Sequence, residues 1–395
     1  MYDFEPGKMK RIPFTGIRRM MEKANKLAAE GRKVIHFEMG QPDFDTPAHI
    51  KEAAKRALDQ GLTSYTSNYG VPALRNAIAD KLQRMNGLTV DHNTELMVTT
   101  GGEEAVAAAI FSLVEQGDEV LVPDPGYIPY SSLVKLVEAV PVPAPLNEKD
   151  NFCFDFERLE TLATPKTKLL ILCSPGNPTG TMMDREQLER LAAFCQKHNL
   201  LVLADEAYEQ VLYDGNRHIS IASLPGMKER AITVQSFSKT YSMCGWRVGY
   251  LAAPAELMRV IIRAHQTIAM CACSFAQAGA AEALTGSQDS LYEMLKEFDR
   301  RRLLVYQGLL DAGLPCRKPQ AAFYLFPDIR EFGMTSVEFA DLLLDKYGVA
   351  TVGGAEFGAS GEGHIRISYA TSYADCQEGV RRIRQYVEDL RAGNP

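Results

Sequence analysis

The turn that follows the apolar run Ala231 to Val234 carries two serines, a lysine and an arginine within a short distance. A lysine that is partly buried beside another cation loses its proton more readily, and the free amine can condense with an aldehyde to form a Schiff base. Arg247 offers a planar set of donors suited to phosphate, and Ser236 and Ser238 can donate to the same anion. A ligand with both an aldehyde and a phosphate, bound through Lys239, suggests pyridoxal 5′-phosphate (PLP).

Lys239 could instead be a solvated lysine, which is the commonest situation for this residue type. The residues near it are unusually apolar for an exposed turn, namely Phe237, Met243, Trp246, Val248 and Tyr250. This setting favours a partly buried, reactive amine.

Two other turns could bind or fix polar groups. Gly101 and Gly102 separate an alternating strand pattern at 95–100 from an apolar helix pattern that runs through Val114. Free backbone N–H groups and the positive end of the helix dipole meet at such a turn, which favours an anion. The loop Ser174 to Gly180 contains two prolines and two glycines, which indicates that Asn177 is held in a fixed position.

Asp205 directly follows the apolar run at 200–204. A carboxylate at the end of a buried strand can pair with a protonated pyridine nitrogen and keep the ring electron-withdrawing. Glu206 is an alternative carboxylate that the residues alone leave open, and Tyr208 could reach the ring oxygen.

These turns share one structural context. Each follows a short apolar run, and helical patterns separate most of the runs. Alternating strands and helices predict an α/β fold with a largely parallel sheet, whose ligands collect beyond the carboxyl ends of the strands. We therefore expect the anion turn, the asparagine, the aspartate and the lysine to meet at one edge.

The lysine segment resembles the signature of the class I and II aminotransferases, within the fold-type I group of PLP enzymes, and is closest to the aspartate and aromatic amino acid branch. The resemblance runs from about Ile12 to the C-terminal helix. It implies a large PLP-binding domain at 45–289, with a mostly parallel seven-stranded sheet flanked by helices. A small α+β domain at 290–395 would be joined by the N-terminal arm at 1–44.

The resemblance also implies roles for individual residues. It assigns the catalytic steps to Lys239, Asp205 and Tyr208. It assigns PLP binding to Tyr65, Gly102, Glu103, Tyr127, Asn177, Asp205, Tyr208, Ser236, Ser238, Lys239 and Arg247. It assigns substrate binding to Ile17, Gly40, Asn177 and Arg366, with Arg366 as the clamp for the α-carboxylate. Tyr65 would reach the cofactor phosphate of the partner subunit in a homodimer.

By the same resemblance, the expected activity is amino-group transfer from an L-amino acid, with aspartate or aromatic donors favoured, to a 2-oxo acid such as 2-oxoglutarate. The reaction would be ping-pong through a Lys239 Schiff base. A fold-type I C–S lyase or synthase is the alternative, because it would use the same cofactor residues. The residues that line the side-chain pocket do not reveal the donor.

The composition of the chain limits the classes of partner that it can have. A net charge of −7 without a block of lysine or arginine argues against nucleic acid. The eight cysteines lack CxxC or zinc spacing, which predicts reduced thiols, no metal site and a cytoplasmic protein. Residues 1–11 lack a signal-peptide pattern, and the longest apolar stretch, 105–114, is shorter than the roughly 20 residues that span a bilayer.

Overall fold

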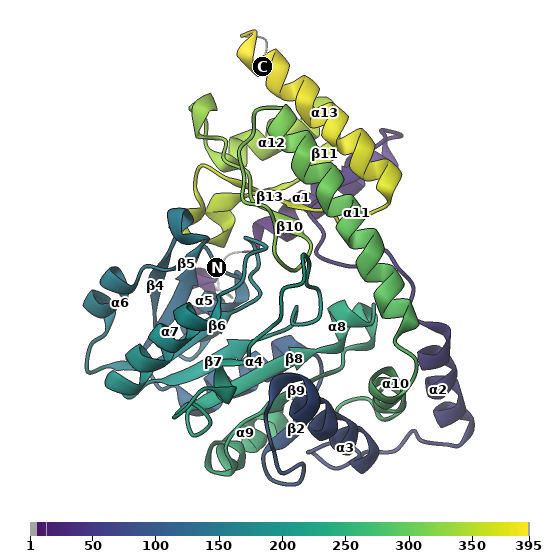
Figure 1. The fold of residues 1–395 in the computed structure, drawn as a ribbon, viewed down its shortest axis with the longest axis vertical. Helices are drawn as coiled ribbons and strands as arrows, with labels where there is room; N and C mark the ends of the chain where they lie inside the picture. The colour runs from purple at the N-terminus through teal and green to yellow at the C-terminus, as the bar shows by residue number, and fades with distance from the viewer. Residues whose placement is uncertain (1–5, 13, 394–395) are drawn as a thin grey trace, which may run out of the picture.

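The structure is a computed structural model that describes residues 6–12 and 14–393 of the chain. Pro13 of the predicted N-terminal arm lies outside the described residues. A large sheet between layers of helices fills the lower part of the molecule, and a smaller group of helices and short strands lies above it (Figure 1).

The large sheet has eight strands in the order β2-β9-β8-β7-β6-β3-β4-β5. Their bounds are β2 (Leu96–Thr99), β3 (Glu119–Asp124), β4 (Val140–Asn147), β5 (Cys153–Phe154), β6 (Thr167–Cys173), β7 (Leu201–Asp205), β8 (Ala231–Ser236) and β9 (Gly249–Ala252). Strand β9 runs antiparallel to both of its neighbours and β5 runs antiparallel to β4, while the other pairs are parallel. The family resemblance implies a mostly parallel sheet of seven strands. The structure has this mostly parallel sheet and adds the two-residue strand β5 at its edge.

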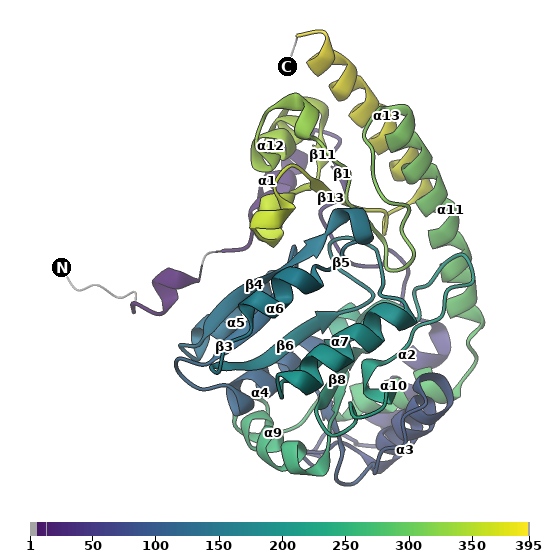
Figure 2. The ribbon, with the colours of Figure 1, turned by 60° about the vertical axis from the view of Figure 1, so that its left-hand side comes forward.

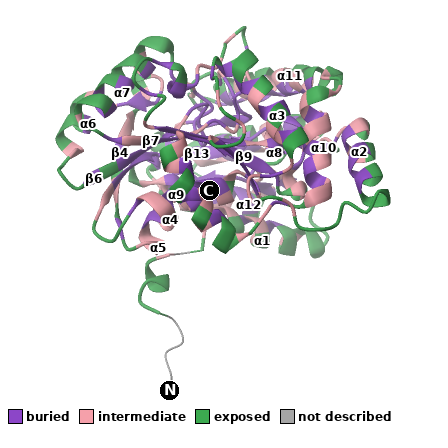
Figure 3. Cartoon of the chain, turned by 90° about the horizontal axis from the view of Figure 1, so that it is seen from below, coloured by how far each residue is buried: buried purple, intermediate pink, exposed green. Residues whose placement is uncertain are grey.

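Helices cover both faces of this sheet (Figure 2). Successive side chains of a strand point to opposite faces, so Ile171 of β6 packs with α4, α5 and α9, whereas Leu170 and Leu172 pack with α6 and α7. The strands are largely buried, and the outer sides of the helices are exposed (Figure 3). The bounds of the helices in this part are α2 (Ala48–Asp59), α3 (Pro72–Lys81), α4 (Gly102–Leu113), α5 (Pro129–Leu136), α6 (Phe156–Leu162), α7 (Arg185–Lys197), α8 (Phe237–Thr240), α9 (Ala255–Ile268) and α10 (Ser274–Thr285).

The smaller group of elements is built from both ends of the described chain. It contains β1 (Ile35–His36), β10 (Tyr324–Leu325), β11 (Val349–Ala350), β12 (Val352–Gly353) and β13 (Ile365–Ser368), with α1 (Gly16–Ala29), α11 (Asp289–Asp311), α12 (Ser336–Tyr347) and α13 (Tyr373–Arg391). The sequence predicts a strand over 321–326, but β10 is shorter. Ala322 has a φ of 56°, and this left-handed conformation interrupts an extended strand.

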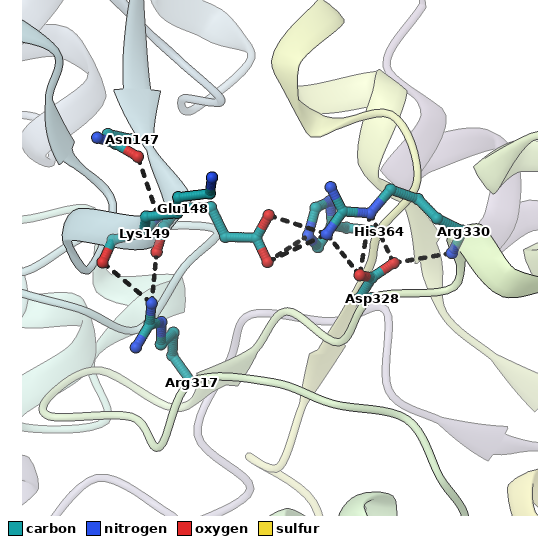
Figure 4. A network of polar contacts seen from close by, with 7 residues as sticks. All are labelled: Asn147, Glu148, Lys149, Arg317, Asp328, Arg330 and His364. Atoms are coloured by element: carbon teal, nitrogen blue, oxygen red, sulfur yellow. Dashed lines mark hydrogen bonds and ion pairs between the residues drawn. The ribbon is translucent and has the colours of Figure 1, made fainter.

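A polar network joins the β4–β5 hairpin of the large sheet to the small group (Figure 4). Glu148 Oε2 lies 3.0 Å from Arg330 Nη2 and Glu148 Oε1 lies 3.6 Å from His364 Nε2. Asp328 pairs with the same arginine, and Arg317 Nη2 donates to the carbonyl oxygen of Glu148 at 3.0 Å. His364 directly precedes β13, so the network fixes the start of that strand against the large sheet.

Within the part of the chain that the structure describes, no helix combines the length and the apolar character that crossing a bilayer requires.

Candidate active site

A cavity of about 320 Å³ lies at the carboxyl edge of the large sheet. The strands β2, β6, β7 and β8 are parallel to one another, so the turns after them open onto the same edge. Of the residues expected at the site, all except Tyr65 line the cavity: Ile17, Gly40, Gly102, Glu103, Tyr127, Asn177, Asp205, Tyr208, Ser236, Ser238, Lys239, Arg247 and Arg366. Tyr65 is 84% exposed and does not line it, and its expected contact with a partner subunit stays a prediction.

Lys239 lies in the short helix α8, directly after β8. Ser236 caps this helix, because its Oγ accepts a hydrogen bond from the amide of Ser238 at 3.2 Å. The Lys239 Nζ donates to the carbonyl oxygen of Gly40 at 2.8 Å and lies 3.8 Å from Cys244 Sγ. The amine is therefore held at the wall of the cavity by a carbonyl oxygen and a thiol.

Asp205 presents its carboxylate to the cavity from the end of β7. Its Oδ2 accepts a hydrogen bond from the Tyr130 hydroxyl at 2.7 Å, and its Oδ1 accepts one from the amide of Ala207 at 3.2 Å. Burial raises the pKa of Asp205, and the Tyr130 hydrogen bond partly offsets that rise. Glu206, the alternative carboxylate, does not line the cavity, so Asp205 is the one of these two acids that faces it.

An anion site forms where α4 begins. Gly101 has a φ of +84°, and a Cβ at this position would lie 2.7 Å from Arg247 Nη2. A Cβ at Gly102 would lie 3.4 Å from the Cβ of Ser236. The arginine, the serine and the first turn of the helix therefore converge on one place, where a phosphate would receive charged and backbone donors.

Arg366 projects from β13 and is 1% exposed. Its Nη1 donates to Asn177 Oδ1 at 3.1 Å and its Nη2 to the carbonyl oxygen of Glu38, while its Nε has no partner among the described residues. The rings of Tyr324 and Phe357 lie 4.7 Å and 4.9 Å from its guanidinium carbon. A buried guanidinium with an unused donor fits a carboxylate ligand, because a buried charge is costly without an opposite charge.

Two tyrosines belong to the site although the sequence gives them no role. Tyr324 Oη lies 2.7 Å from Tyr208 Oη, and a Cβ at Gly40 would lie 2.2 Å from this Tyr324 oxygen. Gly40 is therefore needed for the close approach of the ring. Tyr130 is the second residue of α5 and Tyr127 precedes that helix, so no helical spacing in the sequence marks Tyr130.

The residues fit PLP as a set. An amine, a buried carboxylate with a raised pKa and an anion site line one cavity, and they match the aldehyde, the pyridine nitrogen and the phosphate of the cofactor. Tyr127 lies at the same wall, with its ring edge-on to Tyr130 at 5.4 Å between centroids.

Removing the Tyr130 hydroxyl tests the support of Asp205. A hydrogen bond to a charged group is worth about 1.5–3 kcal/mol, so Tyr130→Phe should lower kcat by roughly 10- to 100-fold. The pKa of Asp205 should rise when this donor is lost, so the acid limb of the kcat/KM profile should move to higher pH. Tyr250→Phe is the matched control, because the buried Tyr250 hydroxyl has no partner among the described residues. An acid limb that stays in place would contradict this role.

The sequence profile of the family described as "Aminotransferase class I and II" matches residues 32–383. The chain is 44% identical over 367 residues to an aspartate aminotransferase of Pyrococcus abyssi, which covers 92% of this chain and 94% of the relative. It is 42% identical over 360 residues to aromatic-amino-acid aminotransferase 2 of Thermococcus litoralis, which covers 91% of this chain and 92% of the relative.

Solved structures show the same fold. The aspartate aminotransferase of Thermus thermophilus with maleate superposes with a TM-score of 0.92 at 34% identity, over 98% of this chain and 100% of that one. The aromatic aminotransferase of Pyrococcus horikoshii superposes with a TM-score of 0.89 at 43% identity, over 94% of this chain and 99% of that one.

Proposed function

The chain belongs to the class I and II aminotransferases, and from this premise we propose that it moves an amino group from an L-amino acid to a 2-oxo acid such as 2-oxoglutarate by a ping-pong reaction. It is an enzyme of the aminotransferase class, with the fold-type I architecture and PLP as its cofactor. One observation carries the proposal: a single cavity brings together the amine of Lys239, the carboxylate of Asp205 and the anion site at Gly102.

We propose a role in the reaction for several residues that line this cavity. The Lys239 amine would hold the cofactor at its aldehyde group. Bound PLP would supply an electron sink that stabilises negative charge at the substrate Cα. Once released by the substrate, the Lys239 Nζ would act as the base that takes the proton from Cα and as the acid that returns it. The Asp205 carboxylate keeps the proton on the ring nitrogen, and Tyr208 and Asn177 orient the ring oxygen.

Arg366 docks the substrate α-carboxylate in this proposal. The Nε of Arg366 has no hydrogen-bond partner among the described residues, and the guanidinium is buried there without a carboxylate partner. Both observations support a bidentate contact with a planar carboxylate. Asn177 fixes the guanidinium from one side, and the backbone near Gly40 borders the same space. Ile17, at the start of α1, lines the cavity and is placed to exclude water from the substrate.

We propose aspartate or an aromatic amino acid as the donor, because relatives with both names match nearly the whole chain. A homodimer in which Tyr65 reaches the partner's cofactor phosphate is also proposed, supported by the 84% exposure of this tyrosine. All eight cysteines are free thiols, which supports a cytoplasmic location. The proposed domain division remains 45–289 for the large domain and 1–44 with 290–395 for the arm and the small domain.

An experiment limited to the first half of the reaction distinguishes an aminotransferase from the alternative, a lyase or a synthase. The purified protein with bound PLP is mixed with aspartate, tyrosine, phenylalanine, alanine or leucine and no 2-oxo acid. We expect the preferred donor to convert one equivalent of PLP to the pyridoxamine form, after which the reaction stops until 2-oxoglutarate is added. Cysteine and cystathionine, which carry a sulfur leaving group, are tested in the same way. Continuous release of ammonia and pyruvate from either compound without an acceptor would contradict transfer and favour a lyase.

A further inference from the structure

A buried polar cluster lies behind the turns that carry Asp205 and Ser236. Its members are Lys81, Asn86, Glu206, Glu209, His218 and Gln235. Their side chains are buried, with Glu206 only 1% and Lys81 only 2% exposed. None of these six residues lines the active-site cavity, so the proposed chemistry does not use them directly.

The Gln235 amide lies at the centre of this cluster. Its Nε2 donates to Glu206 Oε2 at 3.0 Å and to Glu209 Oε2 at 2.7 Å. Its Oε1 accepts a hydrogen bond from Lys81 Nζ at 3.3 Å, and the same ammonium pairs with the Glu209 carboxylate. One side chain of β8 thus links both carboxylates to the lysine.

An unusual turn brings Lys81 and Asn86 together. Helix α3 ends at Lys81 and continues as a π-helical turn, Leu82–Asn86. In a π-helical turn, residues five positions apart in the sequence lie on the same side of the helix. Lys81 Nζ accordingly donates to Asn86 Oδ1 at 3.0 Å. Asn86 Nδ2 in turn donates to Glu209 Oε2 at 2.8 Å. Such turns are rare and frequently mark functional sites, which indicates that the cluster does more than fill space.

The charges of the cluster balance when His218 is protonated. Two carboxylates face one ammonium, and His218 Nε2 lies 3.0 Å from Glu206 Oε2. Burial alone would lower the pKa of His218, but the Glu206 and Glu209 carboxylates together outweigh it and the pKa is raised. Glu206, Glu209 and His218 lie close enough to hold a metal ion, yet the Lys81 ammonium and a protonated His218 balance the two carboxylates without one.

The backbone connects this cluster directly to two residues that line the active-site cavity. Glu206 directly follows Asp205, and Gln235 directly precedes Ser236. Neighbouring side chains at a strand end point to opposite sides, so Asp205 and Ser236 line the cavity while Glu206 and Gln235 meet behind it. The amide of Glu206 also donates to the carbonyl oxygen of Val234 at 2.9 Å.

We propose that Glu206 is a positioning residue for the cofactor: its hydrogen bond to Gln235 holds the Asp205 turn in register with the Ser236 turn. The ring nitrogen and the phosphate of PLP are fixed distances apart, so a shift of one turn against the other loosens both contacts. This inference rests on the proposed roles of Asp205 and Ser236 toward the cofactor.

The protonation of His218 adds a pH dependence to the cluster. A histidine whose pKa is raised on folding stabilises the folded chain below its unfolded pKa, and this contribution is lost as the pH rises through the raised value. The melting temperature of the PLP-free protein should therefore fall across that range, and His218→Gln should flatten the fall. An unchanged pH profile in this variant would show that His218 carries no charge in the folded state.

Titration of the full-length, PLP-free protein with PLP tests the positioning role. Glu206→Leu removes the carboxylate that accepts from Gln235, and we expect the dissociation constant of PLP to rise at least about 10-fold. Glu206→Gln keeps an oxygen that can accept the same hydrogen bond, and it should stay within about threefold of the wild type. Gln235→Ala breaks the bridge from the other side, so it replaces Glu206→Leu if that variant does not fold.

Leu191→Ala is the stability control, because Leu191 of α7 is fully buried in a core cluster whose residues do not line the cavity. It should lower the melting temperature of the PLP-free protein without weakening PLP binding. The inference is overturned if Glu206→Leu binds PLP as tightly as the wild type, or if Glu206→Gln binds as weakly as Glu206→Leu. A wild-type chain that does not bind PLP would overturn the proposed function and this inference together.

Discussion

Lys239→Ala should abolish turnover, with a loss of at least about 10⁴-fold in kcat. In the proposed mechanism, the variant loses both the covalent attachment of the cofactor and the base that moves the proton at the substrate Cα. The carbonyl oxygen of Gly40, 2.8 Å from Nζ, would keep its place but cannot do either task. Single-turnover kinetics with the preferred donor, together with borohydride trapping of bound PLP, measure the two losses separately.

Lys239→Arg is a second variant, which distinguishes loss of the reactive amine from loss of the positive charge. The guanidinium keeps the positive charge and can still donate to the carbonyl oxygen of Gly40, but it stays protonated and cannot serve as a base. We expect it to be as inactive as the alanine variant. Activity within about tenfold of the wild type in either variant would rule out Lys239 as the reacting amine, because loss of a general base alone costs about 10²- to 10⁴-fold.

Asp205→Asn is expected to give the second-largest loss, about 10²- to 10³-fold in kcat. The amide keeps the shape of the side chain and can still accept from the Tyr130 hydroxyl, so the local geometry should survive. The variant loses the buried negative charge that we propose as the partner of the ring nitrogen, and breaking one partner of a buried charge pair costs about 3–5 kcal/mol. Part of this cost should appear as weaker PLP binding and the rest as a slower proton transfer.

Glu206→Gln is a matched control for Asp205→Asn. It makes the same chemical change one residue along the chain, on a carboxylate that does not line the cavity. The kcat of this control should stay within about threefold of the wild type, because its hydrogen bond to Gln235 can be retained. Equal losses in the two variants would contradict both a separate role for the Asp205 charge and the retention of the hydrogen bond between residue 206 and Gln235.

Much of the cavity could be predicted because apolar runs identify the strands of a parallel sheet. Once the runs before Asn177, Asp205 and Lys239 are recognised as parallel strands, the turns after them must open at one edge, and the structure places them there. The residues alone leave the choice between Asp205 and Glu206 open, and only the family resemblance favours Asp205. In the structure Asp205 lines the cavity and Glu206 does not, because neighbouring residues at a strand end face opposite sides.

The support behind these residues could not be predicted. The hydrogen bond from Tyr130 to Asp205 depends on how α5 is rotated over the sheet, which a single helical turn of sequence does not fix. The cluster around Gln235 joins residues far apart in the chain, and charged residues such as Lys81 resemble solvated ones in sequence. Its π-turn has no reliable sequence pattern.

The contact between the β4–β5 hairpin and the start of β13 makes the enzyme sensitive to its ionic environment. The Arg330 side chain is 56% exposed and the Glu148 side chain 38%, so dissolved ions screen their attraction. Strand β13 carries Arg366, so weaker contacts at the start of this strand would let the Arg366 guanidinium move more. Increasing ionic strength should therefore raise KM for the amino acid, while the rate of the proton transfer proposed for Lys239 should change less.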